Sequence, residues 1–493
     1  MNIKFFLKTF GCQMNVADSG IFAECLQKAG CLPAGDLDEA EIVIINTCTV
    51  RQHAEDRALS EIGQLKKWKD KDSPPGCRKI LIVAGCVAER LKDQIKKRFP
   101  HVDIVIGAKD VEHIPEILET AGIAGTGISA ARAAEDVGAT GITQAPGIAE
   151  SSEITEPGGQ TQAVGTGSAV VSSFVTITRG CNNFCSYCIV PYVRGSEKHR
   201  PVQEIISEIE CLVARGVKEV TLLGQNVNSY LHTDGGAGAG INFSRFLDKV
   251  NSIKGLLRIR FLTSHPKDFT DDIIDAIASL DKVCEHIHLP LQSGSDRILN
   301  LMNRKYTAEY YLQLLDKIRK KIPDVGLTTD LLVGFPSETD DDFSRTLDVV
   351  KSADFDFAYV FKYSPRHKAT SSQLNDDVPV IIKQKRHALL LELCNEMSVN
   401  KNKKFIGQTV EILAGAVTVS KTATAPESAP SSESVSASQK GKTIVGKTRD
   451  NRTVVVETKK FPGDLIGNLI NVKITGSRIH SLTAHLPLNK GQK

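Results

Sequence analysis

Three cysteines lie within eight positions of the chain, at Cys181, Cys185 and Cys188 in the stretch RGCNNFCSYCIVPYVRG. A structural zinc site takes four ligands, often as two closely spaced cysteine pairs. Three thiolates can instead hold three irons of a 4Fe-4S cluster and leave the fourth iron open to a small chelating molecule. The alternatives are a zinc site or three unrelated core cysteines. The spacing C-x3-C-x2-C, directly after an expected strand, favours the cluster.

A second set of cysteines, Cys12, Cys48 and Cys86, stands at the ends of three apolar segments that we expect to be strands. The carboxyl ends of parallel strands lie along one edge of a sheet, so these thiols could converge on one metal site. Buried cysteines are also common after apolar strands, but the repeated placement argues against chance. The other six show no such pattern and are interpreted as ordinary small hydrophobic residues: Cys25, Cys31, Cys77, Cys211, Cys284 and Cys394.

Alternating apolar strands and amphipathic helices must position both sets. In residues 1–120 strands are expected at 2–12, 40–48, 78–86 and 102–108, which predicts a parallel sheet. In residues 171–403 six are expected, at 172–180, 219–227, 257–266, 286–294, 326–336 and 355–365. Six βα units are too few for a closed eight-fold barrel and favour an open one, with the active site at the carboxyl ends of its strands.

The predicted fold class is therefore α/β, with an N-terminal parallel α/β domain, a partial (β/α)6 TIM-like barrel and a small C-terminal β-barrel at 404–487. Residues 121–170 are rich in Gly, Ala, Ser and Thr and are predicted to be a low-complexity linker. A Ser-, Ala- and Pro-biased stretch at about 416–442 is predicted to be a flexible insertion in the tail barrel.

Composition sets the broad class of the protein. The 493 residues are 41% hydrophobic and 24% charged, as in globular proteins. We find no apolar run of 18 residues and no signal peptide, so we expect no membrane span and a cytoplasmic location with reduced thiols. Residues 403–493 hold 14 Lys or Arg against 6 Asp or Glu, which gives this segment a net charge of +8. Because the net charge of the whole chain is +3, the remaining residues carry a net charge of −5. A basic tail suggests a polyanionic partner or simply a well-solvated surface.

The three-cysteine loop resembles the signature of the radical S-adenosylmethionine enzymes, in which an aromatic residue precedes the third cysteine, as Tyr187 does here. The resemblance implies that the open iron binds the amino and carboxylate groups of S-adenosylmethionine. One-electron reduction then yields a 5′-deoxyadenosyl radical.

The two cysteine sets together resemble the methylthiotransferase family, which joins a three-cysteine domain, a radical barrel and a tail β-barrel called TRAM. The resemblance implies a second 4Fe-4S cluster on Cys12, Cys48 and Cys86 that carries or donates sulfur. It implies that one S-adenosylmethionine methylates this sulfur, while a second yields the radical that abstracts hydrogen from the substrate. Two 4Fe-4S clusters and S-adenosylmethionine are thus the expected cofactors.

The family has branches that modify isopentenylated adenosine at tRNA position 37, its threonylcarbamoyl counterpart, or an aspartate of a ribosomal protein. The stretches GCQMNVADS, NTCTVR, TLLGQNVNSY, LPLQSGSDRIL and VGFPSETDDDF resemble the first branch. This implies methylthiolation at C2 of that adenine in the tRNA anticodon loop, with an external electron donor and a monomeric enzyme. A modifier of a ribosomal protein and a non-catalytic iron–sulfur RNA-binding protein remain alternatives. The tail barrel can supply phosphate contacts, serve as a structural cap, or both.

Polar residues after the barrel strands are expected to bind S-adenosylmethionine and the base. The candidates that we predict for cofactor contacts are Tyr187, Arg194, Gln225, Asn226, Gln292, Ser293 and Gly334. Gly334 would let backbone approach the adenine, because it has no side chain. Arg194 could pair with a carboxylate. Glu338 is either a cofactor contact or an acidic residue at a helix N-terminus.

Overall fold

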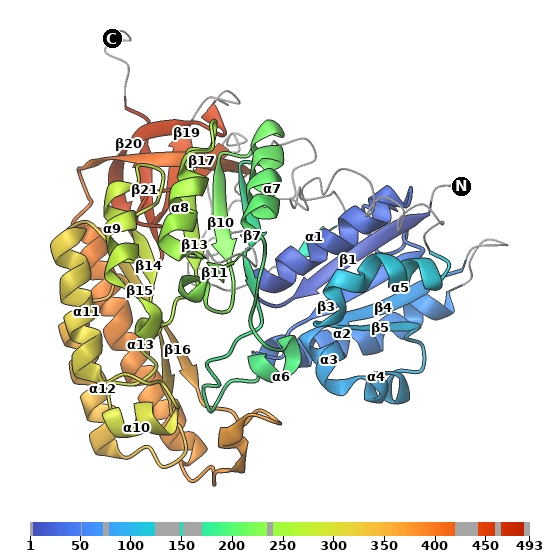
Figure 1. The fold of residues 1–493 in the computed structure, drawn as a ribbon, viewed down its shortest axis with the longest axis horizontal. Helices are drawn as coiled ribbons and strands as arrows, with labels where there is room; N and C mark the ends of the chain where they lie inside the picture. The colour runs from blue at the N-terminus through green and yellow to red at the C-terminus, as the bar shows by residue number, and fades with distance from the viewer. Residues whose placement is uncertain are drawn as a thin grey trace, which may run out of the picture.

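The structure is a computed structural model that describes residues 3–50, 52–71, 78–123, 148–150, 170–233, 240–419, 442–458 and 465–487. Figure 1 shows an N-terminal α/β domain (blue), a central barrel (green to orange) and a C-terminal β-barrel (red). The predicted linker and the predicted insertion fall largely on residues 124–147, 151–169 and 420–441, outside the described residues, so both remain predictions.

The N-terminal domain is built on a parallel sheet of order β2-β1-β3-β4-β5, with β6 beside β1. Its strands are β1 (Lys4–Phe10), β2 (Leu32–Pro33), β3 (Ile42–Thr47), β4 (Ile80–Gly85), β5 (Ile104–Gly107) and β6 (Ile148–Glu150). Its helices are α1 (Gln13–Lys28), α2 (Gln52–Asp70), α3 (Cys86–Leu91), α4 (Asp93–Arg98) and α5 (Ile114–Thr120). The strands bury apolar side chains on both faces, as parallel strands between helices must. The four predicted strands are confirmed.

The central barrel consists of two parallel three-stranded sheets, β13-β10-β7 and β14-β15-β16, joined by a parallel bridge between Ile259 and Val283. The strands are β7 (Ser172–Thr176), β10 (Glu219–Leu223), β13 (Arg258–Leu262), β14 (His286–His288), β15 (Gly326–Val333) and β16 (Phe357–Lys362). The helices around them are α7 (Val202–Ala214), α8 (Phe243–Asn251), α9 (Asp271–Ser279), α10 (Asp296–Leu301), α11 (Ala308–Lys321), α12 (Asp340–Ala353) and α13 (Val380–Lys403). The predicted open arc of six βα units is confirmed.

The C-terminal domain is a closed barrel of order β17-β18-β19-β21-β20 around a small apolar core. Its strands are β17 (Thr409–Val419), β18 (Lys442–Lys447), β19 (Thr453–Thr458), β20 (Leu469–Ser477) and β21 (Ser481–His485). No helix in the described ranges is long and apolar enough to cross a membrane.

The turn between β18 and β19 packs against the amino ends of the central strands. The Arg260 guanidinium donates to the carbonyls of Thr448 at 2.7 Å and Arg449 at 2.9 Å, and Arg449 in turn pairs with Glu285 at 2.6 Å. Arg452 pairs with Asp356, which lies just before β16. The tail barrel therefore caps the end of the central barrel opposite the carboxyl ends of its strands.

Candidate active site

The carboxyl edge of the N-terminal sheet brings the first cysteine set together. Phe10, Thr47 and Gly85 are level across β1, β3 and β4. Cys48 and Cys86 follow their strands at once, and Cys12 stands two residues beyond Phe10 at the start of α1. Adjacent strands lie about 4.8 Å apart, so the three thiols share one short stretch of this edge.

The three thiols interact electrostatically. A hydrogen bond with Cys48, aided by the charge of Arg194, lowers the pKa of Cys12 to about 6. The same hydrogen bond and burial raise the pKa of Cys48. Burial raises the pKa of Cys86 as well, against the opposing charge of Arg194. The sheet edge thus brings together three interacting thiols, a donor set that fits an iron–sulfur cluster.

The second cysteine set lies on the loop between β8 (Thr178–Arg179) and α6 (Val190–Arg194). Gly180 begins the loop with φ +75°, and a Cβ there would lie 2.1 Å from the carbonyl oxygen of Ser196, so only glycine fits. The Cys181 amide donates to the Gly195 carbonyl at 3.2 Å, which closes the loop at its base. The Cys188 amide donates to the Cys185 carbonyl at 2.9 Å, which turns the last two thiols toward one region.

Arg304 supports this loop from the segment after α10. Its Nη1 donates to the Cys185 sulfur at 3.4 Å, its Nη2 to the Pro290 carbonyl at 2.8 Å and its Nε to the Tyr306 hydroxyl at 2.8 Å. Burial raises the pKa of Cys181 to about 11 and that of Cys188 to about 12. These thiols keep their protons until a metal displaces them.

The two cysteine sets meet through α6. Cys86, at the start of α3, packs with Ile189 and Val193, which follow Cys188 directly in the chain. Cys12 packs with the Met14, Ala17 and Leu223 cluster, between the N-terminal domain and the central barrel. The carboxyl edges of both sheets therefore face the same region (Figure 1).

In the described part of the chain, no three His, Cys, Asp or Glu side chains are grouped to hold a single metal ion. A cluster places each thiolate on a different iron, so its ligands stand further apart than those of one ion. That the two cysteine sets hold clusters remains a prediction.

Buried polar atoms collect at the carboxyl ends of the first three barrel strands. The side-chain oxygens of Thr178, Gln225, Asn226 and Ser264 find no hydrogen-bond partner among the described residues. The amide nitrogen of Asn226 is used, donating to Asp268 at 2.7 Å. Buried polar groups are normally satisfied, so this group fits a polar ligand above the strands. Gln225 and Asn226 were predicted here from sequence; Thr178 and Ser264 were missed, because isolated hydroxyls carry no motif.

The other predicted cofactor contacts occupy varied positions. Tyr187 packs on the Met302 and Phe335 cluster beside the cysteine loop. Gln292 continues β14 through a bridge to Leu331. The Ser293 hydroxyl lies 3.3 Å from that of Thr346 in α12, and so packs within the barrel wall. A contact of these side chains with a cofactor remains a prediction.

Gly334 and Glu338 belong to one short turn after β15. The Glu338 carboxylate accepts the amides of Gly334 and, at 3.1 Å, Phe335, and it pairs with Arg386 at 3.3 Å. Glu338 therefore fastens the turn that precedes α12, which agrees with its structural alternative. A Cβ at residue 334 would lie 2.4 Å from the Lys383 side chain. This close approach accounts for the glycine; a contact with adenine remains a prediction.

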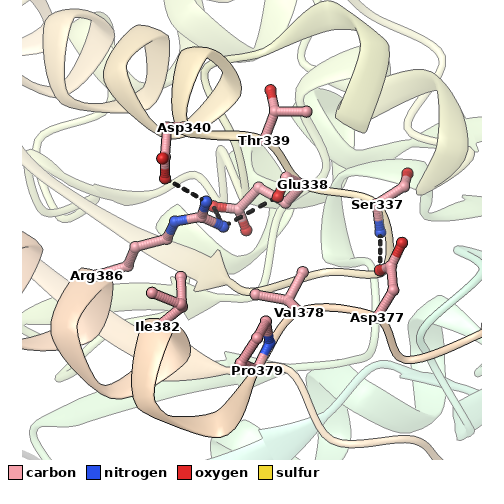
Figure 2. A pocket seen from close by; sticks show the side chains of 9 residues that line it. All are labelled: Ser337, Glu338, Thr339, Asp340, Asp377, Val378, Pro379, Ile382 and Arg386. Carbon is pink, nitrogen blue, oxygen red and sulfur yellow. Dashed lines mark hydrogen bonds and ion pairs between the residues drawn. The ribbon is translucent and has the colours of Figure 1, made fainter.

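A hollow of about 280 Å³ lies beside this turn (Figure 2). In Figure 2 Arg386 points at Glu338 and Asp340, and the Ser337 amide points at Asp377. None of the six candidate cysteines lines it, so it is separate from the cysteine sites.

Arg194 points away from the barrel mouth, toward the N-terminal domain. Its Nη2 pairs with the Asp18 carboxylate at 3.0 Å, and Arg179 pairs with the other oxygen at 2.7 Å. The predicted carboxylate partner of Arg194 is thus found within the protein itself. The contact spans 176 residues and gives no local sequence signal.

The comparisons with known proteins bear on this arrangement. Residues 175–350 match the Radical SAM superfamily, and residues 4–107 match Uncharacterized protein family UPF0004. A protein of Caldicellulosiruptor saccharolyticus named tRNA-2-methylthio-N(6)-dimethylallyladenosine synthase is 42% identical over 98% of this chain and 92% of its own. The protein of that name from Clostridium novyi is also 42% identical, over 98% of this chain and 97% of its own. The chain belongs to this synthase family.

Membership of the synthase family confirms the predicted methylthiotransferase resemblance. A 4Fe-4S cluster and S-adenosylmethionine are the cofactors that its radical S-adenosylmethionine domain implies. Among solved structures, the radical S-adenosylmethionine methyltransferase TsrM from Kitasatospora setae aligns with a TM-score of 0.49 and 15% identity, over 86% of this chain and 82% of that chain.

Proposed function

We propose that this chain methylthiolates C2 of N6-dimethylallyladenosine (N6-isopentenyladenosine) at position 37 of tRNA, with S-adenosylmethionine as methyl donor and radical source. One observation carries the proposal. In a chain of the synthase family, Cys86 of one cysteine set packs on Ile189, which directly follows Cys188 of the other set. An enzyme that uses the radical loop alone would have no need of the second site.

In this proposal Cys181, Cys185 and Cys188 hold the cluster that binds S-adenosylmethionine, and the Cys12, Cys48 and Cys86 edge holds a second. When loaded, the first supplies the electron that cleaves S-adenosylmethionine, and the second supplies the sulfur. The chain's own residues set the surroundings. Arg304 orients Cys185 through the hydrogen bond from its guanidinium to the sulfur.

The unpaired oxygens of Thr178, Gln225, Asn226 and Ser264 are proposed to receive the donors of S-adenosylmethionine. Hydrogen bonds from its amino and hydroxyl groups would satisfy these oxygens and fix the direction of the sulfonium relative to the cysteine loop.

The substrate is proposed to be an anticodon loop, because reaction at an adenine carbon requires a base outside the helical stack. An external electron donor, a monomeric state and a cytoplasmic location complete the proposal, since the reaction consumes an electron and needs reduced thiols.

Mass spectrometry of tRNA nucleosides from a deletion strain tests the substrate. We expect the 2-methylthio form of N6-isopentenyladenosine to disappear and the unmodified precursor to accumulate. Plasmid-borne wild-type protein should restore it, whereas Cys181→Ala and Cys48→Ala should not. An unchanged nucleoside profile in the deletion strain would refute the proposed substrate. With dithionite and S-adenosylmethionine, the purified protein should form 5′-deoxyadenosine; its absence would favour a non-catalytic iron–sulfur protein.

A further inference from the structure

We propose that Arg194 is a positioning residue for the cluster on Cys12, Cys48 and Cys86, presenting its free N–H edge and its positive charge to that site. The inference rests on the proposed second cluster. It assigns to a residue of the central barrel the control of a cofactor in the neighbouring domain.

An ion pair with Asp18 holds one edge of the Arg194 guanidinium in place. Its Nη2 is bound to Asp18 at 3.0 Å, and the side chain is only 4% exposed. Its Nη1 is buried and finds no hydrogen-bond partner among the described residues. Leaving a buried guanidinium N–H without an acceptor is unfavourable, so an acceptor is expected at that edge.

The groups around that edge are the cysteines. α6, which ends at Arg194, packs on α3, which begins at Cys86. Burial opposes the charge of Arg194, but the thiols of Cys86, Cys12 and Cys48, together with Asp18, raise its pKa. The free edge of Arg194 and the three sulfurs therefore occupy the same buried region.

The charge count of this region points to an anionic partner. The buried Asp18 carboxylate is shared between two guanidiniums, the buried one of Arg194 and the partly exposed one of Arg179, so it neutralises Arg194 only in part. Buried charges require compensation. A cluster bound by three thiolates carries net negative charge, and it lies on the side of Arg194 that Asp18 does not cover.

The consequence is a shift in reduction potential. A positive charge beside a cluster favours its reduced, more negative state and raises the potential. Arg194→Gln should therefore lower the potential of this cluster. Asp18→Asn removes a negative charge from the same region and should raise it.

The experiment uses the full chain carrying Cys181→Ala, Cys185→Ala and Cys188→Ala, so that only the second site can hold iron. Iron and sulfide content are measured first, and the midpoint potential is then determined by redox titration followed by electron paramagnetic resonance. Arg179→Gln is the matched control. It removes the same charge from the other oxygen of Asp18, but its side chain is 16% exposed against 4% for Arg194, so it should shift the potential less. Arg194→Lys keeps the charge and should stay closer to the parent than Arg194→Gln.

The results separate the two proposals. If the chain with Cys181→Ala, Cys185→Ala and Cys188→Ala binds no iron, the second cluster does not exist, and the proposed function is refuted with it. If the chains bind about four irons, but Arg194→Gln and Arg179→Gln give the same potential, the role of Arg194 alone is overturned. If the Arg194→Gln chain does not fold, the comparison of Asp18→Asn with the parent decides: an unchanged or lower potential refutes the inference.

Discussion

Arg452 tests whether the basic residues of the tail barrel serve RNA or the fold. Its side chain is 11% exposed and pairs with Asp356, while its Nε pairs with Asp450 at 2.7 Å. Its guanidinium also lies 4.6 Å from the centre of the Phe405 ring. We expect Arg452→Ala to loosen the tail barrel from the central barrel and to leave tRNA contacts unchanged.

The magnitude follows from these contacts. Removing one member of a buried ion pair costs about 3–5 kcal/mol. In the Arg452→Ala variant, Asp356 still accepts the Leu327 amide at 2.9 Å and pairs with Lys401 at 3.3 Å. We therefore expect a free-energy cost at the lower end of that range. A loss of about 3 kcal/mol corresponds to roughly a hundredfold increase in local opening.

Hydrogen exchange of peptides from residues 442–458 measures this opening directly. Tryptophan fluorescence does not, because the single tryptophan, Trp68, is in α2 of the N-terminal domain. Lys473→Ala is the control: it removes the same charge from an exposed site on β20, and exchange should change by less than about threefold.

The salt dependence of tRNA binding completes the test. A lost phosphate contact reduces the slope of log K against log salt by about 0.9. The reasoning is refuted if Arg452→Ala lowers that slope by about one while exchange in residues 442–458 stays at the wild-type rate.

Three further predictions concern the central barrel. Arg304→Lys keeps the positive charge but loses the branched guanidinium that donates to the Cys185 sulfur. We expect 5′-deoxyadenosine formation to fall at least tenfold while the iron content stays unchanged. A loss of iron would instead show that Arg304 is a structural part of the loop. Burial alone would raise the pKa of Asp342, but hydrogen bonds from an arginine, a serine and a threonine hold it well below its usual range. Asp342→Asn should therefore cost about 1–2 kcal/mol at pH 7 in chemical unfolding, and the difference from wild type should shrink as pH falls below about 3.9; a constant difference would refute the charge argument. Gly180→Ala should lower thermal stability far more than Gly122→Ala, because the two share φ values of +75° and +70° but only residue 180 has a backbone oxygen 2.1 Å from the added Cβ; equal losses would show that φ strain alone acts.

The sequence was sufficient for the elements that carry an apolar pattern. The strands that end near Cys12, Cys48 and Cys86 are rich in apolar residues, and parallel pairing then requires their ends to meet at one edge. The six barrel strands follow from the same rule. The edge strands β2 and β6 were not predicted, because segments of two and three residues are too short to show an alternating apolar pattern.

The contacts that organise the site could not be predicted in this way. Asp18 is an acidic residue inside an ordinary helical pattern, and its partners Arg179 and Arg194 are 161 and 176 residues away. The basic balance of the tail was counted correctly, yet Arg449 and Arg452 are used inside the protein, against Glu285 and Asp356. A count of charges measures composition, whereas function depends on which charges remain available.

The short helix α6 lies between the two cysteine sets. Cys188 and Arg194 are separated by a helix of five residues, which rises about 8 Å at 1.5 Å per residue. This helix packs on Cys86, so the N-terminal domain contacts the segment that directly follows the cysteine loop. Arg366 fixes the arrangement from the other side, donating to the Val50 carbonyl at 3.0 Å and to Gln52 at 2.8 Å, close to Cys48. The N-terminal domain is therefore held against the central barrel at two places, the α6 contact with Cys86 and the Arg366 contacts with Val50 and Gln52.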